Sequence, residues 1–367
     1  MIQQAARDFA QRELIKDVIE RDHNALFPTE HVKTMAELGF LGMTVDTKYD
    51  GGGMDTISYV LAVEELSKVD ASASVIVSVN NSLVCYGLEK FGTEEQKNKF
   101  LKPLARGEKL GAFLLSEPEA GSDATSQRTT AEDKGDYYLV NGTKNWITNA
   151  NSASTYIVIT QTNPAKKHKG ITAFIIEKNS PGITLGPHED KMGMRSSDTH
   201  SVMFNDVKVP KENRIGAEGF GFTFAMKVLE GGRIGIAAQA LGLASGALER
   251  ATAYAKERKA FGKPIFAFQN TRFKLAECQA LLMASRTLVD ACIVAHLKGE
   301  LGIDRAALTK YWITDNQCKL VDECLQLFGG YGYMKEYPIA RLYADARVQR
   351  IYGGTNEIMK ELASRFL

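Results

Sequence analysis

The chain lacks the features that mark secreted, metal-binding and membrane-spanning proteins. Its five cysteines form no CxxC pair and its six histidines show no metal-ligand spacing, so we expect no metal site. An odd, scattered set of cysteines predicts reduced thiols, in a bacterial cytoplasm or a mitochondrial-matrix-like compartment. No uninterrupted apolar run approaches the roughly 18 residues that span a bilayer, and the first residues lack the apolar core of a signal peptide. We therefore expect a protein that is not secreted and has no membrane span.

An excess of either charge is also missing. Lys and Arg number 45 against 44 Asp and Glu, and the net charge of +1 argues against electrostatic capture of nucleic acid or of an anionic membrane. The composition, 44% hydrophobic and 24% charged, is typical of a soluble globular protein. A length of 367 residues suits roughly two or three packed domains.

Three regions differ in their periodicity, which predicts an α+β fold. Residues 1–110 have apolar residues at helical spacing, with a capping-box pattern at Thr93 and a helix end at Gly107. Residues 111–219 predict a small antiparallel β domain, in which the pair Asn141-Gly142 favours a hairpin turn. Residues 220–367 are helical again. The strands in the middle region are expected near 137–140, 156–160, 171–176 and 201–204, and the C-terminal helices near 235–258, 270–298 and 304–327.

Two stretches in the middle region carry residues suited to a flavin. In 113–123 a strand ends in a Pro/Gly loop that presents backbone N–H groups and hydroxyls, which can bind flavin edge atoms and a phosphate. The alternative is a simple β-turn. In 142–150, Trp146 and Thr148 would share one face of a strand and offer an aromatic plane and a hydroxyl. Taken alone, a Trp is more often part of a core.

About 24 residues apart and in this order, the two stretches resemble the flavin-binding signature of the acyl-CoA dehydrogenases. The resemblance covers essentially the whole chain. Residues 231–242 and 80–83 are similar to the short-chain, butyryl-CoA branch, while 258–263 and 324–333 resemble the family's Arg-x-x-Phe-Gly segment and its glycine-rich turn. No GxGxxG fingerprint follows a strand, so FAD would be bound by an interface rather than by a Rossmann fold.

This resemblance implies a helical N-terminal domain, a middle β domain and a C-terminal four-helix bundle. It also implies an FAD-dependent homotetramer, a dimer of dimers, which oxidises acyl-CoA and passes electrons to an electron-transfer flavoprotein. The flavin would contact Phe113, Leu115, Ser116, Ser122, Trp146 and Thr148. The FAD tail of a neighbouring subunit would meet Arg258, Phe261 and Gln269, with Gln326, Gly329, Gly330, Thr355 and Glu357 closing around the dinucleotide. Substrate contacts would come from Ser122, Glu230, Arg233, Gly353 and Gly354.

For three of these residues a plainer role is open. Arg258 would also complement the dipole at a helix C-terminus. Gln269 and Gln326, taken singly, would lie on solvent-exposed helix surface.

The chain departs from the family at one chemically decisive position. Most members carry a catalytic glutamate in a Tyr-Glu-Gly-Thr motif, where this sequence has Tyr352, Gly353, Gly354 and Thr355. The family reaction needs a carboxylate within about 3 Å of the proton next to the thioester carbonyl. It also needs hydrogen-bond donors on the carbonyl oxygen, which in the family are a ribityl hydroxyl and the backbone N–H of the base residue. Gly353 would retain that N–H but not the base.

The second base position known in the family is vacant as well. The isovaleryl and long-chain branch places its glutamate just before the arginine equivalent to Arg233, where this chain has Gly232. The tail 352–362 resembles that long-chain branch, whereas the helix around Arg233 resembles the short-chain branch. Glu230 is two residues away from Gly232, about 200° around a regular helix, so it would act as a substitute base only from a loop-like start. Tyr352 is a poor base at neutral pH.

Two functions stay open at this point. The first is an impaired dehydrogenase that converts short or medium-chain acyl-CoA to trans-2-enoyl-CoA. The second is a catalytically silent, flavin-containing protein that binds acyl-CoA or serves as a scaffold. An oxidase or nitroalkane-type relative would itself need a carboxylate base.

Overall fold

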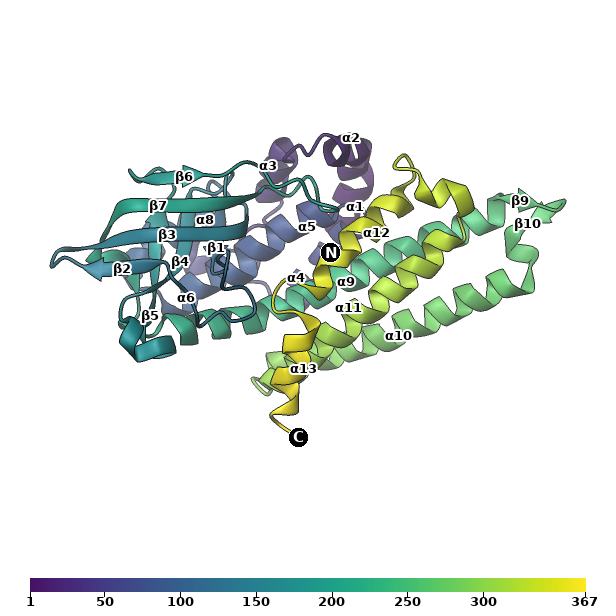
Figure 1. Ribbon diagram of the computed structural model, residues 1–367. Helices are drawn as coiled ribbons and strands as arrows, with labels where there is room; N and C mark the ends of the chain where they lie inside the picture. The colour runs from purple at the N-terminus through teal and green to yellow at the C-terminus, as the bar shows by residue number, and fades with distance from the viewer.

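The computed structural model describes residues 1–367 as a helical region, a β-sheet and a second helical region (Figure 1). The predicted order of helix, sheet and helix is confirmed. Thr93 closes the expected capping box with Gln96, and Gly107 ends the last helix before the sheet with φ of 70°. The first region consists of α1 (Ile2–Arg12), α2 (Val18–His23), α3 (Thr29–Glu37), α4 (Thr56–Ser67), α5 (Ala71–Ser78), α6 (Tyr86–Phe91), α7 (Glu94–Gln96) and α8 (Lys102–Ala105).

A π-helical segment, Val79–Cys85, joins α5 to α6 and ties the first region to the sheet. Two buried asparagines hold it in place. Asn80 donates to Leu41 O at 2.8 Å and accepts from Gly111 N, the first residue of the sheet, at 2.9 Å. Asn81 accepts from Met43 N at 2.8 Å. These bonds satisfy backbone groups of the neighbouring loop and of the first strand.

The middle region is one mixed sheet rather than a purely antiparallel one. Its order is β6-β7-β3-β2-β4-β5-β8, and β1 pairs with β4. Most pairings are antiparallel as expected, but β1 and β2 each run parallel to β4. The strands are β1 (Gly111–Leu114), β2 (Thr130–Asp133), β3 (Tyr137–Thr148), β4 (Thr155–Gln161), β5 (Ile171–Glu177), β6 (Ile183–Leu185), β7 (Thr199–Pro210) and β8 (Arg214–Ile215).

The expected hairpin at Asn141-Gly142 is wrong. Strand β3 continues through both residues, and the register against β7 shifts between Val140 and Gly142. The pair is used for a β-bulge instead, because the Asn141 side chain and Asp206 exchange hydrogen bonds across the strands. The turn lies earlier, at Gly135, whose φ is 93° and whose N–H donates to the Asp133 carboxylate at 2.8 Å.

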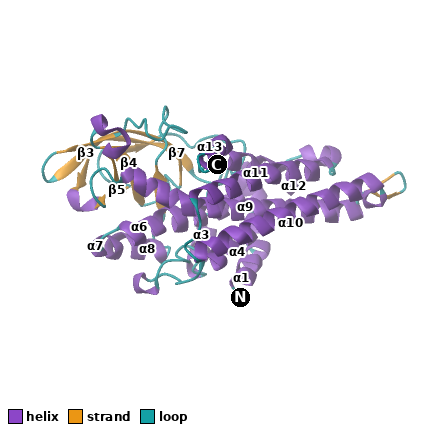
Figure 2. Ribbon diagram, turned by 90° about the horizontal axis from the view of Figure 1, so that it is seen from below, coloured by secondary structure: helices purple, strands orange, loops and turns teal.

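The C-terminal region is built on long helices that extend away from the sheet (Figures 1 and 2). The expected helices near 270–298 and 304–327 are confirmed. Helix α9 begins at Gly221, well before the predicted start near 235, and runs without interruption to Glu257. The elements are α9 (Gly221–Glu257), the short β9 (Lys259–Ala260) and β10 (Lys263–Pro264), α10 (Gln269–Leu297), α11 (Ile303–Gln326), α12 (Pro338–Arg347) and α13 (Asn356–Ser364).

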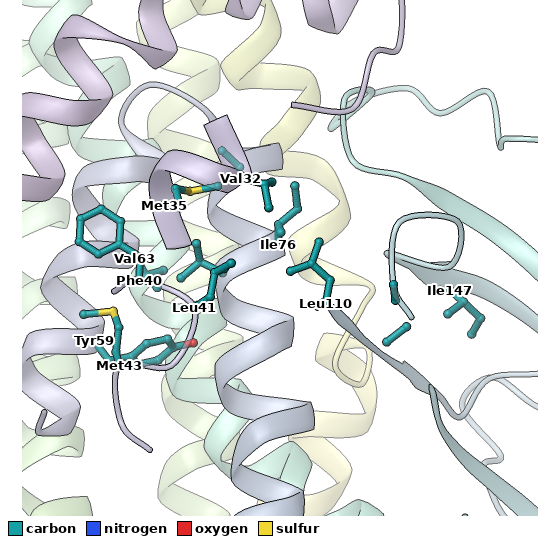
Figure 3. Packing of buried hydrophobic residues seen from close by; sticks show 14 of the residues in the cluster. Val32, Met35, Phe40, Leu41, Met43, Tyr59, Val63, Ile76, Leu110 and Ile147 are labelled. Atoms are coloured by element: carbon teal, nitrogen blue, oxygen red, sulfur yellow. The ribbon is translucent and has the colours of Figure 1, made fainter. Parts of the chain in front are cut away.

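Glycines let α9 lie directly on α4 of the first region. A Cβ on Gly242 would come within 2.3 Å of Glu64 O, and one on Gly235 within 2.5 Å of the Tyr59 hydroxyl. Apolar side chains of the N-terminal region, including Met35, Phe40 and Ile76, continue this packing toward the sheet (Figure 3). Two apolar clusters each contain residues from all three regions and connect them.

A buried lysine fixes the segment that precedes α13. Lys310 of α11 is fully buried, and its ammonium donates to Gly354 O at 2.8 Å and to Asn356 Oδ1 at 2.9 Å. Asn356 in turn donates to Asp315 at 2.8 Å and to Thr314 at 2.9 Å. Burial lowers the pKa of Lys310 to about 7. The loop at Gly353 and Gly354 is therefore anchored from behind by α11.

Two helices are long and apolar enough to pass a composition test for a membrane span. The first, Ala71–Phe91, is 83% buried inside the fold, as a core helix of a globular protein is. The second, Gln269–Leu297, is only 28% buried. Its exposed apolar residues include Phe273, Met283, Val294 and Leu297, so α10 presents an apolar face that the single chain does not cover.

The contact between α9 and α4 gives a first prediction. Gly242→Ala should destabilise the protein by about 1–3 kcal/mol, because the added methyl group overlaps the backbone of Glu64. The matched control is Gly231→Ala on the same helix, where a Cβ meets nothing within 4 Å and better helix propensity should stabilise by up to about 1 kcal/mol. Urea denaturation of both variants measures the difference, and equal stabilities would contradict this account of the packing.

Lys310 gives a second prediction, in the pH dependence of stability. Its pKa is about 7 in the fold and about 10.4 when unfolded. Between these values the unfolded chain holds the proton that the folded chain has released, so stability should rise with pH. The free energy of unfolding of the wild type, relative to Lys310→Met, should increase from pH 7 to pH 10. The exposed-site control Lys33→Met should show no such trend, and a flat difference for Lys310→Met would contradict the shifted pKa.

Candidate active site

A cavity of about 560 Å³ lies where the three regions meet. The π-helical segment, the start of the sheet, α9 and the last loop and helix all contribute to its wall. It gathers most residues that the sequence predicted for the flavin and the thioester, namely Phe113, Leu115, Ser116, Ser122, Trp146, Thr148, Arg233, Gly353 and Gly354. Residues far apart in the sequence thus form one site.

Trp146 reaches the cavity from a bulge in β3 rather than from a regular strand. The register against β7 shifts between Lys144 and Ile147, and Trp146 has a φ of 56°. The indole is 58% exposed, which is unusual for a tryptophan unless its face serves a ligand. Thr148, two residues later, also lines the cavity. An open aromatic face beside a hydroxyl fits the isoalloxazine ring of a flavin.

The loop after β1 is anchored by a buried ion pair that the sequence did not reveal. The Lys144 ammonium lies 2.8 Å from the Glu117 carboxylate, and Glu117 also accepts from the backbone N–H groups of Arg128 and Thr129. Burial lowers the pKa of Lys144 to about 8. This anchor holds the loop that brings Ser116 and Ser122 to the cavity wall. An ion pair between a strand residue and a loop residue leaves no periodic pattern in the sequence, so it can be recognised only in the folded structure.

At Gly353 and Gly354 the backbone conformation and the neighbouring side chains suit residues without a side chain. Gly353 and Gly354 have φ of 65° and 92°, in the left-handed region that favours glycine. A Cβ on Gly353 would lie 2.3 Å from Ile236 Cδ1. Isoleucine 236 therefore fills the space in which a side chain at 353 would begin. The N–H of Gly353 has no hydrogen-bond partner within the chain, so it is free to bind a ligand oxygen.

Glu230, the suggested substitute base, lies outside the cavity wall. Helix α9 is regular at Glu230, and this residue is not part of the cavity wall. Burial raises the pKa of the Glu230 carboxyl, against the influence of Arg233 and Lys227. The Tyr352 hydroxyl donates to Gln239 Oε1, and burial raises its pKa. The loop-like start that would bring Glu230 to the substrate is absent.

Two carboxylates do line the cavity, and both are held by other groups. Asp123 accepts hydrogen bonds from the Ser126 and Thr125 hydroxyls, which lower its pKa. Glu361 lies on α13, where it is paired with Arg365 at 3.1 Å. Neither residue belongs to a pattern that predicts a place in the site. Asp123 is thus engaged by two hydroxyls, and Glu361 by an exposed ion pair with Arg365.

Arg233 has the opposite property, since it lacks a partner. Its side chain is 5% exposed and lines the cavity. Its Nε has no hydrogen-bond partner. Burial lowers the pKa of the guanidinium, with Glu230 as the acid that counteracts the shift.

The residues predicted for an FAD tail lie elsewhere in the single chain. A second cavity, of about 530 Å³, brings together Arg258, Gly329 and Gly330, and the Arg258 guanidinium lies 5.3 Å from the centre of the Tyr331 ring. Phe261 is 93% exposed, and Gln269, Gln326 and Glu357 are also exposed on their elements. The Thr355 hydroxyl caps α13 by accepting from Ile358 N at 3.2 Å. Their joint role at a dinucleotide remains a prediction.

Comparison with known proteins agrees with this arrangement. Sequence models of the N-terminal, middle and C-terminal domains of acyl-CoA dehydrogenases match residues 1–108, 112–207 and 219–367. The butyryl-CoA dehydrogenase of Megasphaera elsdenii is 45% identical, with a TM-score of 0.97 over 100% of this chain and 97% of that one.

Two further solved structures are similar over the whole chain. A chain in the structure of the electron transferring flavoprotein of Acidaminococcus fermentans is 44% identical, with a TM-score of 0.98 over 100% of this chain and 96% of the other. A glutaryl-CoA dehydrogenase of Mycobacterium smegmatis, solved in complex with FADH2, is 31% identical, with a TM-score of 0.95 over 100% and 93% of the two chains. The protein belongs to the acyl-CoA dehydrogenase family of FAD-dependent oxidoreductases.

Proposed function

We propose that this protein binds FAD and short-chain acyl-CoA in the main cavity and performs α,β-dehydrogenation slowly, because proton abstraction lacks its carboxylate. The observation that carries the proposal is the composition of the cavity wall. The cavity wall contains the residues proposed to contact the flavin, such as Trp146 and Thr148, and the free N–H of Gly353. It contains no unpaired carboxylate near Gly353 that could act as the base. The similarity to a butyryl-CoA dehydrogenase supports the short acyl chain.

The chain's own residues would bind and polarise the substrate. When bound, FAD supplies an acceptor for the hydride that leaves the β-carbon. Gly353 N–H would donate to the thioester oxygen and stabilise negative charge that develops there. Apolar side chains of Leu83, Ile236 and Leu229, all in the cavity wall, would exclude water from the acyl chain. What the site lacks is a group that removes the proton, a loss worth roughly 10²–10⁴ in rate.

Two kinds of protein partner are part of the proposal. The uncovered apolar face of α10 supports a homo-oligomer, for which we propose a dimer of dimers. In it, Arg258, Phe261 and Gln269 contact the FAD tail of a neighbouring subunit. The similarity to a chain in an electron transferring flavoprotein structure supports such a flavoprotein as the electron acceptor.

Five free cysteines support a reducing compartment for this protein. For the domain boundaries we propose residues 1–110, 111–219 and 220–367.

The alternative, a silent flavoprotein that only binds acyl-CoA, is favoured by the same missing carboxylate. One titration separates the two functions. Under anaerobic conditions butyryl-CoA should first shift the flavin spectrum and then bleach it over minutes to hours, because hydride transfer follows slow proton loss. A spectral shift that never progresses to bleaching would contradict dehydrogenation and establish the silent binder. No spectral change at all would contradict both.

Restoring the base gives a further prediction. Gly353→Glu alone has to adopt a left-handed backbone and displace Ile236. In an Ile236→Ala background the side chain has room, and we expect dehydrogenation of butyryl-CoA at least tenfold faster than in Ile236→Ala itself. The matched control is Gly353→Gln in the same background, which carries the same strain and bulk but no base. Equal rates for the Glu and Gln variants would show that the barrier lies in another step.

A further inference from the structure

The guanidinium of Arg233 is a buried cation in the cavity wall that makes no close ion pair. The side chain is 5% exposed, its Nε has no hydrogen-bond partner, and it makes no ion pair within 4 Å. Buried charges in folded proteins are normally paired, because leaving water costs them their hydration. An unpaired cation in a cavity wall therefore indicates an anionic group on the ligand.

The other charges of the site support this inference. Asp123 and Glu361, the carboxylates in the cavity wall, are occupied by Ser126 and Thr125 and by Arg365 respectively. Glu230 acts on Arg233 from the adjacent turn of α9 but lies outside the wall. Lys310 lies behind the loop, where its ammonium donates to Gly354 O and Asn356 Oδ1 and is not part of the wall. Arg233 is thus the buried basic group of the cavity wall, and both carboxylates of the wall are bonded to other residues.

A carboxylate on the substrate would also solve the chemical problem of the missing base. Proton abstraction is one way to form an enolate next to a thioester carbonyl. Loss of CO2 from a carboxyl group on that same carbon is another, and it needs no base. The bond between the carbon and the carboxyl group breaks, its electron pair enters the enolate, and Gly353 N–H can stabilise the enolate oxygen. The negative charge is conserved, so Arg233 faces an anion before and after the step.

We propose that the acyl end of the cavity binds a 2-carboxyacyl thioester of coenzyme A, with the carboxylate held by Arg233, and that loss of this carboxylate as CO2 replaces proton abstraction. This inference rests on the proposed acyl-CoA site. Water protonates the enolate carbon to give the acyl thioester, and the hydroxide so formed converts CO2 to bicarbonate, so that atoms and charge balance without an added oxidant.

Binding tests the proposal with a matched pair of ligands. The purified flavoprotein is titrated calorimetrically with 2-carboxybutyryl-CoA and with butyryl-CoA, which differ only in the carboxylate. We expect the carboxylated ligand to bind at least tenfold more tightly. In Arg233→Met that preference should disappear, so that the two ligands bind with equal affinity to this variant. In the control Arg365→Met, the other arginine of the cavity wall, the preference should persist.

Equal affinities in the wild type, or a preference that survives in Arg233→Met, would overturn the assignment of Arg233. If Arg233→Met does not fold, the wild-type preference and its weakening by sodium formate, compared with sodium chloride at equal ionic strength, still decide the question, since formate competes for the same cation. Failure of butyryl-CoA to bind or to perturb the flavin spectrum would instead count against the proposed acyl-CoA site. The two failures are thus distinguishable.

Product analysis tests the chemical step. With 2-carboxybutyryl-CoA labelled with ¹³C in the free carboxyl group, labelled bicarbonate should appear at least tenfold faster than without enzyme, and Arg233→Met should lose this gain. Release at the uncatalysed rate would overturn the decarboxylation.

The anion that binds Arg233 could instead come from a free small carboxylate such as formate. Saturable acceleration of butyryl-CoA oxidation by formate, without a preference for the carboxylated ligand, would assign the site to it and overturn the proposal.

Discussion

The close approach of α9 to α4 is the contact on which the rest of the structure depends. At Gly242 and Gly246 the helix backbone of α9 lies against the carbonyl groups of Glu64 and Lys68, at a distance that no side chain permits. Because α9 is one unbroken helix, this contact also determines where Arg233 and Ile236 lie, about two to four turns away. Domain packing and the wall of the cavity are therefore set by the same element.

A second constraint acts on the loop opposite α9. Lys310 and Asn356 form a buried network that holds Gly354 O. A flexible loop at Gly353 would present its N–H in many directions, whereas an anchored loop presents it in one. Two consecutive glycines in left-handed conformations would otherwise carry a large entropic cost, which the bonds from α11 offset. The network thus supports preorganised binding of an oxygen even though no catalytic side chain follows from it.

Much of this architecture could be predicted from periodicity and from local signals. The helices near 270–298 and 304–327 and the capping box at Thr93 follow from such signals. The Asn141-Gly142 pair was misleading, because a bulge and a hairpin turn make the same local demands on backbone conformation. Contacts between distant residues, such as Lys144 with Glu117 and Lys310 with Gly354, leave no local pattern. They arise only when the fold brings two unrelated segments together.

The site itself shows why the loss of the glutamate is more than one exchanged residue. Gly353 adopts a conformation that glycine favours, Ile236 occupies the space where a side chain would start, and the regular helix keeps Glu230 out of the cavity. These three features come from different segments and agree with one another. Ile236 Cδ1 occupies the position that a Cβ at residue 353 would take, and Lys310 anchors the loop. The absence of the carboxylate therefore agrees with the residues around it.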